Sequence, residues 1–187
     1  MTMKKSIGAR TMPAPAPVWV VGTYDGEGRP NVATLAWVGI CCSKPPCVAV
    51  SLRKNRHSYA AIFARRAFTI NVPSRAYAKA ADYVGIVSGE KEDKFARAGL
   101  TAVRSDLVDA PYVAEFPVVM ECRLRHTLEI GSHTQFVGEV LDVKVDEALL
   151  GPDDRPDVGK LDLMVYVDDY YAVGEMVAKA FSIGKEI

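Results

Sequence analysis

The amino-acid sequence predicts one α+β domain that is dominated by an antiparallel β-barrel with peripheral helices. Three runs near the N-terminus are rich in β-branched and aromatic residues, and short turn-forming segments separate them. Two long strand-like runs follow in the second half, with helical segments between the two groups. No repeat, low-complexity tract or linker divides the 187 residues, so we expect a single domain over residues 1–187.

The first three predicted strands cover residues 18–24, 31–42 and 47–52. Residues 25–30 contain an Asp-Gly dipeptide and a second glycine, which supply the positive φ angles of a hairpin loop. Two prolines within residues 43–46 end the second strand, because proline cannot donate to a ladder. Adjacent antiparallel strands with short connections favour a meander or a barrel.

The remaining elements follow from capping and breaker residues. Ser58 is a plausible N-cap for a helix over residues 59–66, and a short strand over residues 67–73 ends in proline. Helices are expected over residues 75–87 and 93–98, the second closed by Gly99. Residues 101–116 are expected to be irregular. Strands over residues 118–125 and 134–145 are joined through residues 126–133, and the tail combines a strand-like segment, 160–171, with a short helix, 173–181.

The charge balance excludes broad classes of partner. The chain has 23 basic and 23 acidic residues, which gives no electrostatic reason to expect nucleic acid or an anionic membrane. The N-terminus lacks the apolar segment of a signal peptide, and the longest largely apolar stretch, residues 32–42, is shorter than the ~20 residues of a membrane helix. We therefore expect a cytoplasmic protein that binds charged ligands through local basic clusters.

The four cysteines do not have the paired spacing of a zinc or iron–sulfur site. Cys41, Cys42, Cys47 and Cys122 are predicted to be buried free thiols in a reducing compartment. The alternative is a thiol near a redox cofactor, with Cys42 or Cys47 as the candidate.

Motifs for hydrolytic, phosphate-loop, zinc-protease and dinucleotide-binding sites are missing from the sequence. Three histidines far apart in sequence make a histidine-rich metal site improbable, so no metal is expected. A cofactor that carries its own reactivity needs few protein acids and bases, so this pattern is compatible with a cofactor-dependent redox protein.

The strongest local feature is a basic segment that leads into a helix. Arg53, Lys54 and Arg56 are followed by the Ser58 hydroxyl and by the free N–H groups of a helix N-terminus. Such a combination suits a phosphate group. The alternative is a solvated basic loop.

An ordered series of short motifs runs along nearly the whole chain. It comprises Pro17-x-x-Val20-x-Gly22-Thr23-x-Asp25-x-x-Gly28-x-x-Asn31-x-x-Thr34-x-x-Trp37, Cys41-Cys42-Ser43-Lys44-Pro45-Pro46, Ser88-Gly89 with Asp93-Lys94-Phe95, Glu121-Cys122, Gly131-x-His133, Phe136-Val137-Gly138-Glu139-Val140 and Tyr170-Tyr171-x-Val173-Gly174. In order and spacing these motifs resemble the flavin reductase-like FMN-binding split-barrel family, which includes the flavoredoxins.

The resemblance implies a split barrel that binds FMN non-covalently. In this family the second strand lies along the isoalloxazine ring, the basic segment holds the phosphate, and a lysine near the pyrimidine edge would raise the reduction potential. The implied FMN neighbours are Asn31, Ala33, Thr34, Leu35, Ala36, Trp37, Ser51, Leu52, Arg53, Arg56, His57, Ser58, Asn71, Lys94, His133 and Tyr166. Arg56 and Ser58 are the leading phosphate ligands.

Three of these residues have structural alternatives. Trp37 and Tyr166 suit core packing equally well, and Lys94 lies in a run of charges typical of a solvated face. His133, flanked by Gly131 and Ser132, suits a residue directed at the cofactor better than a core histidine, whereas His126 is expected at the surface.

The resemblance implies a redox function of one of two kinds. The protein is an enzyme in which NAD(P)H passes a hydride to the flavin N5, without a catalytic side chain, or an electron carrier that exchanges electrons with a redox protein partner. A split-barrel flavoprotein related to pyridoxamine phosphate oxidase is a third, weaker alternative. Relatives cover the open barrel edge by dimerising, so a C2 homodimer is expected.

Overall fold

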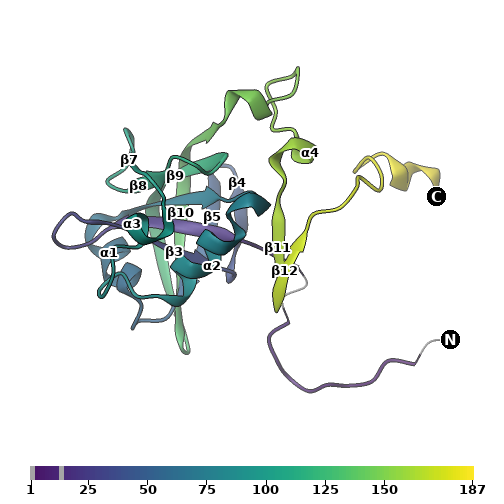
Figure 1. Ribbon diagram of the computed structural model, residues 1–187. Coiled ribbons are helices and arrows are strands. Elements are labelled where there is room, and N and C mark those ends of the chain that lie inside the picture. Colours follow the sequence, from purple (N-terminus) through teal and green to yellow (C-terminus); the bar gives the residue numbers. More distant parts are fainter. Residues whose placement is uncertain (1–2, 13–14) are drawn as a thin grey trace.

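The computed structural model describes residues 3–12 and 15–187 (Figure 1). Its main element is a seven-stranded antiparallel sheet. In spatial order the strands are β3 (Pro30–Leu35), β2 (Trp19–Tyr24), β6 (Ala67–Val72), β9 (Val118–Ile130), β10 (His133–Val145), β5 (Pro46–Leu52) and β4 (Val38–Ser43). The predicted mainly β architecture is confirmed.

The two edges of this sheet are neighbours in the sequence. Only Ala36 and Trp37 separate β3 from β4, yet these strands lie at opposite ends of the strand order. The sheet therefore curls until its edges are joined by the chain itself rather than by a continuous hydrogen-bond ladder, which makes it a split barrel. The prediction of one strand over residues 31–42 is wrong, and so is the meander, because β4 pairs with β5 instead of continuing along β2.

Two hydrophobic clusters pack against the sheet. Trp19 and Val21 point into the barrel with Phe68 and Phe136, whereas the alternate residue Val20 points outward toward the helices. Successive side chains of a strand point to opposite faces, so β2 needs apolar residues on both faces. This explains its uninterrupted apolar sequence.

The helical segments pack on both sides of the sheet. They are α1 (His57–Arg65), the 3₁₀ turn η1 (Arg75–Tyr77), α2 (Ala78–Ile86) and α3 (Lys94–Ala98). The helices α2 and α3 cover the outer face of β2 and β3, whereas α1 packs its Ile62 into the inner cluster. Asp93 caps α3 through the N–H of Ala96. Gly99 ends the helix as predicted, with a φ of 66°. The N-cap prediction for Ser58 is wrong: Arg56 is the N-cap of α1, and Ser58 is buried within the first turn.

The longest hairpin, β9–β10, extends further than predicted. Residues 126–133 were expected to connect two strands, but only Gly131 and Ser132 lie between the strands. Gly131 has a φ of 51°, which suits a two-residue hairpin turn. Backbone pairing does not depend on the polarity of the side chains, so the polar residues near the tip of the hairpin continue the two strands. The expected irregular segment also contains a small hairpin, β7 (Ala102–Arg104) with β8 (Pro111–Val113).

The C-terminal part forms an arm beside the barrel (Figure 1). After η2 (Glu147–Leu149) and α4 (Val158–Leu161), β11 (Met164–Val167) and β12 (Asp169–Ala172) form a hairpin that pairs with β1 (Ala16–Pro17). The predicted helix over residues 173–181 is absent from this described segment, and a 3₁₀ turn, η3 (Ile183–Glu186), follows instead. A short helix without packing partners is marginal in water.

Each helix in residues 3–12 and 15–187 is too short or too polar to span a lipid bilayer.

Candidate functional site

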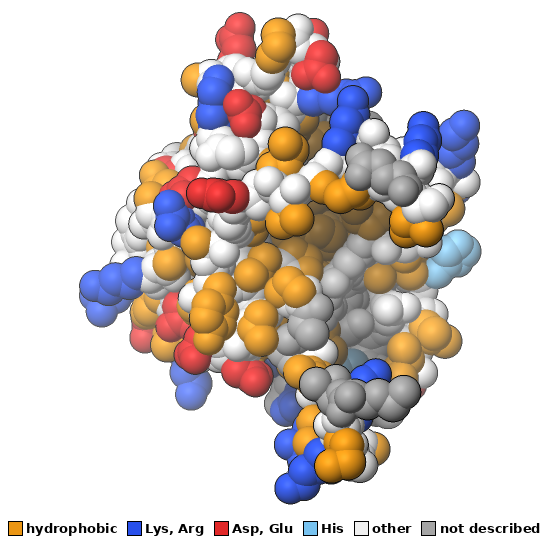
Figure 2. All heavy atoms as spheres, turned by 90° about the vertical axis from the view of Figure 1, so that its right-hand side faces the viewer, with side chains coloured by type: hydrophobic (Ala, Val, Ile, Leu, Met, Phe, Trp, Pro, Cys, Tyr) orange, Lys and Arg blue, Asp and Glu red, His pale blue; other side chains and the backbone are white. Residues whose placement is uncertain are grey.

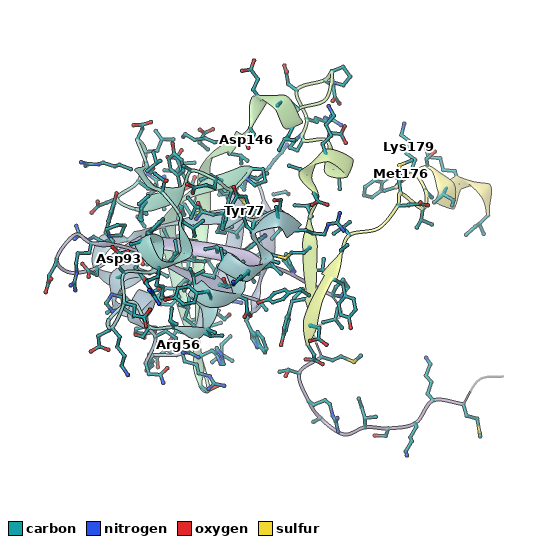
Figure 3. The ribbon with its side chains drawn as sticks, viewed as in Figure 1. Arg56, Tyr77, Asp93, Asp146, Met176 and Lys179 are labelled. Atoms are coloured by element: carbon teal, nitrogen blue, oxygen red, sulfur yellow. The ribbon has the colours of Figure 1, made fainter. Side chains whose placement is uncertain are left out.

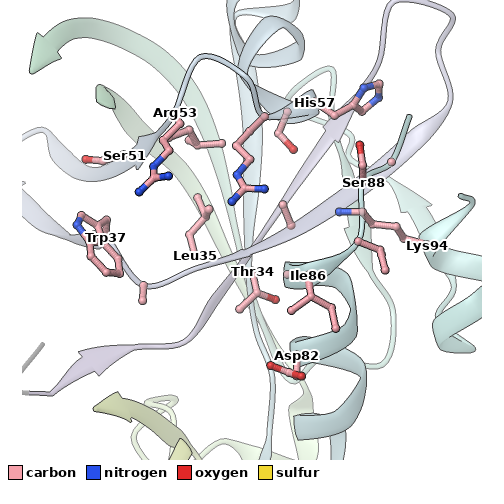
Figure 4. A pocket seen from close by; sticks show the side chains of 18 of the residues that line it. Thr34, Leu35, Trp37, Ser51, Arg53, His57, Asp82, Ile86, Ser88 and Lys94 are labelled. Atoms are coloured by element: carbon pink, nitrogen blue, oxygen red, sulfur yellow. The ribbon is translucent and has the colours of Figure 1, made fainter. Parts of the chain in front are cut away.

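A pocket of about 530 Å³ opens where the two edges of the barrel meet (Figure 4). Its walls come from the end of β3, the linker to β4, the end of β5, the start of α1 and the end of α2. Lys94 of α3, His133 of β10 and the arm hairpin complete it. The split in the barrel thus creates the pocket.

The structure brings nearly all of the predicted site residues together on this pocket. Those that line it are Ala33, Thr34, Leu35, Ala36, Trp37, Ser51, Leu52, Arg53, Arg56, His57, Ser58, Lys94, His133 and Tyr166. Asn31 and Asn71 do not belong to the lining.

Asn71 has a structural role. Its amide donates to the Val20 carbonyl (2.9 Å) and to the Thr69 hydroxyl (3.0 Å), and its Oδ1 accepts from the Val113 N–H (2.8 Å). These bonds join β2 and β6 to β8 and leave the fully buried side chain no group to offer a ligand. The structure therefore places Asn71 away from the pocket, contrary to the prediction.

Asn31 lies directly behind the pocket wall. Its Nδ2 donates to Ser58 Oγ (2.9 Å), so it fixes a serine that does line the pocket. Its buried Oδ1 has no hydrogen-bond partner among the described residues. A Cβ added to Gly89 would collide with this oxygen, so only glycine lets the segment after α2 close over Asn31.

The basic segment ends the pocket at the N-terminus of α1. Arg53 and Arg56 are exposed, line the pocket, and have no ion-pair partner within the described ranges. The first turn of α1 contains no acidic residue, and no side chain caps it. Free N–H groups and two guanidinium groups make this end of the pocket suited to an anion. Lys54, in contrast, faces away and pairs with Glu129 (2.7 Å).

A buried carboxylate, that of Asp25, lies beside the first residue of this helix. Asp25 accepts from the N–H groups of Glu27 and Arg29 and from Arg29 Nε, each at 2.9 Å. Burial alone would raise the pKa of Asp25, but these hydrogen bonds outweigh it and lower the pKa. His57 Nε2, which is buried without a hydrogen-bond partner in the described structure, lies 3.8 Å from this carboxylate.

Lys94 is buried rather than part of a solvated face. It is 4% exposed, and its Nζ donates to the carbonyl oxygens of Val32 and Val84, both at 2.8 Å. Burial, together with the nearby Arg56 charge, lowers the pKa of Lys94 to about 8. An ammonium group has three donors, so one remains for a pocket ligand. Lys94 thus ties β3 to α2 and also reaches the pocket (Figure 4).

Aromatic side chains form another wall of the pocket. Trp37 and His133 stack with parallel rings, 3° between their planes and 6.4 Å between centroids. Trp37 is 44% exposed, so the core-packing alternative for it is wrong. His133 Nδ1 lies 2.8 Å from Ser132 Oγ, which orients the imidazole. Tyr166 combines both alternatives, because it lines the pocket and packs against the outer cluster.

The sequence did not indicate the wall that α2, the segment after it and β12 provide, nor the contributions of Val18 and Asn55. The additional lining residues are Val18, Asn55, Asp82, Gly85, Ile86, Val87, Ser88, Gly89 and Tyr170. Tyr170 of β12 donates to Asp82 of α2 (3.0 Å), and burial, together with this hydrogen bond, raises the pKa of Tyr170 to about 12. The Ser88-Gly89 and Tyr170-Tyr171 motifs were the available signals, but neither indicates a wall shared by residues so distant in sequence.

The cysteines lie elsewhere. None belongs to the described pocket lining, which contradicts the idea of a thiol beside the ligand. Cys47 and Cys122 are buried as predicted, whereas Cys41 and Cys42 are exposed. The described residues contain no group of three or more His, Cys, Asp and Glu that could hold a metal ion.

The model of the flavin reductase like domain matches residues 11–174. The chain belongs to this family. Within the flavin reductase-like family, the chain is similar to the flavoredoxin of Desulfovibrio vulgaris (Miyazaki F), with a TM-score of 0.93 and 57% identity over 97% of this chain and 100% of the other. The resemblance inferred from the sequence motifs and the split-barrel fold are thereby confirmed.

Two more distant relatives extend the comparison. A flavoredoxin from Methanosarcina acetivorans is 30% identical, with a TM-score of 0.92 and 99% of each chain covered. The reductase component of a 4-nitrophenol 4-monooxygenase/4-nitrocatechol 2-monooxygenase from Rhodococcus opacus is 32% identical over 63% of this chain and 60% of its own length. This family context favours the flavin reductase branch over one related to pyridoxamine phosphate oxidase.

Proposed function

We propose that the chain binds FMN non-covalently in the pocket and acts as a redox protein through it. The observation that carries this proposal is the placement of Arg53 and Arg56 at the N-terminus of α1, opening onto the same pocket as Trp37 and Lys94. An anion site, an aromatic wall and a buried cation share one cavity. A phosphorylated, planar, redox-active ligand fits all three.

The pocket matches FMN in size and in polarity. The pocket volume of about 530 Å³ lies within the usual range for cofactor sites, roughly 300–1,000 Å³. Arg53 and Arg56, which form no ion pair with any described residue, suit the phosphate, and the indole of Trp37 suits a ring system. Flavoredoxin relatives support the same ligand.

Each part of the pocket then has a definite task. Arg56 and the Ser58 hydroxyl hold the phosphate, while Asn31 fixes Ser58 from behind. The chain from Ala33 to Trp37 would line the ring, and Lys94 would offer its remaining donor to the polar edge of the ring. When bound, FMN supplies the two-electron redox chemistry at its N5, and the protein binds, orients and shields it.

Comparison of FMN with riboflavin tests this assignment. Riboflavin lacks the phosphate, so fluorescence titration should give a much weaker complex for riboflavin than for FMN. Equal affinities for the two flavins would contradict the assignment of the phosphate to the Arg53–Arg56 end of the pocket.

We further propose that the electrons come from NAD(P)H, with a reduced protein partner as the alternative. The Rhodococcus opacus reductase component supports the enzyme, but no feature of the pocket favours NADH over NADPH. Steady-state oxidation of NADH and NADPH, with and without added FMN, separates the alternatives. Steady turnover supports the reductase, whereas tight FMN with negligible turnover and rapid reduction by another protein supports the carrier.

We also propose a C2 homodimer built on the face that carries the arm. Hydrophobic side chains gather around a hollow on this face (Figure 2). Met176 lies on the part of the arm that projects from the barrel, followed by Val177 and Phe181, which are both 98% exposed (Figure 3). Apolar side chains on a projecting arm need a partner surface, and an isologous pair supplies one for each arm. Only monomer in light scattering at micromolar protein would overturn this proposal.

A further inference from the structure

Three of the four cysteines gather at the tip of the β4–β5 hairpin, away from the pocket lining. Cys42 of β4 is the direct Cα partner of Cys47 of β5, next to the last pair of the ladder, Ser43 with Pro46. The register shifts between Ile40 and Cys42, so Cys41 is the extra residue of a bulge and has no partner across the ladder.

The register places Cys42 and Cys47 within disulfide range. Directly opposed residues of an antiparallel pair have Cα atoms about 4.5–5.5 Å apart. A disulfide needs Cα atoms about 4.4–6.8 Å apart. Because the strands already hold the two residues opposite each other, closing the bond requires rotation of side chains rather than movement of the backbone.

The two thiols differ in access. Cys42 is exposed, and its Sγ lies 3.5 Å from the Lys44 carbonyl oxygen at the turn. Cys47 is 7% exposed, and burial, together with the neighbouring Cys42 and Cys41, raises the pKa of its thiol. An external reagent therefore meets Cys42 first, while Cys47 is placed to react second from within the hairpin.

We propose that Cys42 and Cys47 form a reversible thiol–disulfide site that reacts with low-molecular-weight disulfides, separately from the flavin pocket. In the first step the Cys42 thiolate attacks the external disulfide, forms a mixed disulfide and releases one thiol. In the second step the Cys47 thiolate attacks the Cys42 sulfur and releases the second thiol. The protein loses two protons and two electrons, and the external disulfide becomes two thiols.

Formation of the disulfide would affect one edge of the barrel. The disulfide would link β4, an edge strand of the seven-stranded sheet, to β5 at the turn. At the other end of the same ladder, the Ser51 N–H donates to the Trp37 carbonyl oxygen (2.9 Å) where the strand reaches the pocket. Oxidation thus restrains the strand that follows Trp37.

Glutathione disulfide is the probe that tests this site. The reduced protein is incubated with an excess of it, quenched with acid and analysed by intact mass and by peptide mapping without reductant. We expect the mass to fall by two hydrogens, with Cys42 linked to Cys47, and dithiothreitol to reverse the change.

Single substitutions separate the roles of the three thiols. Cys47→Ala should accumulate one glutathione on Cys42, and Cys42→Ala should form no link to Cys47. Cys41→Ala, the matched neighbour, should behave like the original chain. Since Cys42 is exposed, its variant folds even if Cys47→Ala does not. A stable glutathione adduct on the original chain, a link through Cys41, or no reaction at all would overturn the proposal.

Discussion

At the scale of single residues, side chains with similar sequence signals have different roles. Arg56 and Lys54 belong to one basic segment, but only Arg56 lines the pocket, while Lys54 pairs with Glu129. Asn31 and Asn71 both lie on strands, but Asn31 fixes the lining residue Ser58, whereas Asn71 uses its whole amide for structural hydrogen bonds away from the pocket. The sequence identifies the kinds of residue in a site, and the tertiary contacts decide which of them are available to a ligand.

Replacing Arg56 tests the anion end of the pocket. Arg56→Ala should weaken FMN binding by about 1.5–3 kcal/mol, the usual value of a hydrogen bond to a charged group. Lys54→Ala is the matched control and should leave the affinity unchanged, because Lys54 lies outside the lining. Fluorescence titration measures both. Equal affinities for Arg56→Ala and the original chain would contradict the assignment.

Lys94 should make stability depend on pH in the alkaline range. Its pKa is lowered to about 8 in the folded state, below the ordinary value of 10.5 that it regains on unfolding. Below about pH 8 both states bind the proton, and the fold bears the full cost of a buried charge. Between the two pKa values only the unfolded state binds the proton, so the free energy of unfolding rises with pH.

The comparison that isolates this effect is with Lys94→Met. One pKa unit corresponds to about 1.4 kcal/mol, so the original chain should gain up to about 3 kcal/mol relative to the variant as the pH rises from 7 to 10.5. Urea unfolding across this range measures the difference. A difference that does not change with pH would show that Lys94 is not a buried, perturbed amine.

At the scale of elements, local signals predicted the regular parts of the fold. The Asp-Gly turn after β2, the Gly99 stop of α3 and the proline after β6 all lie where the sequence indicates. The break at Ala36 and Trp37 could not be predicted, because no proline or glycine marks it. It exists because β4 pairs with β5 on the far edge of the sheet.

A glycine in β10 tests how tightly the barrel interior is packed. A Cβ added to Gly138 would collide with the Phe68 ring and approach Cys122 Cβ to 3.1 Å. Gly138→Ala should therefore destabilise the fold by about 1–3 kcal/mol, the usual cost of overpacking. Gly39→Ala on the edge strand β4 is the control, because an added Cβ there meets nothing within 4 Å. Equal unfolding midpoints for the two variants would contradict the packing described for Phe68.

At the scale of the whole molecule, the split in the barrel and the proposed flavin site are one feature. The chain crosses from one sheet edge to the other at Ala36 and Trp37, and the pocket opens at that crossing. The arm adds Tyr166 and Tyr170 to the wall, and the Tyr170–Asp82 hydrogen bond holds β12 to α2. Sequence motifs could predict most of the lining, but not the wall from α2 and β12, which depends on tertiary packing.

The visible spectrum of the protein, purified without added flavin and then titrated with FMN, tests the central claim most directly. We predict flavin absorption bands, either present from the start or appearing on titration, with FMN released on denaturation. A protein that is colourless and whose titration leaves the FMN spectrum and fluorescence unchanged would contradict FMN binding in this pocket.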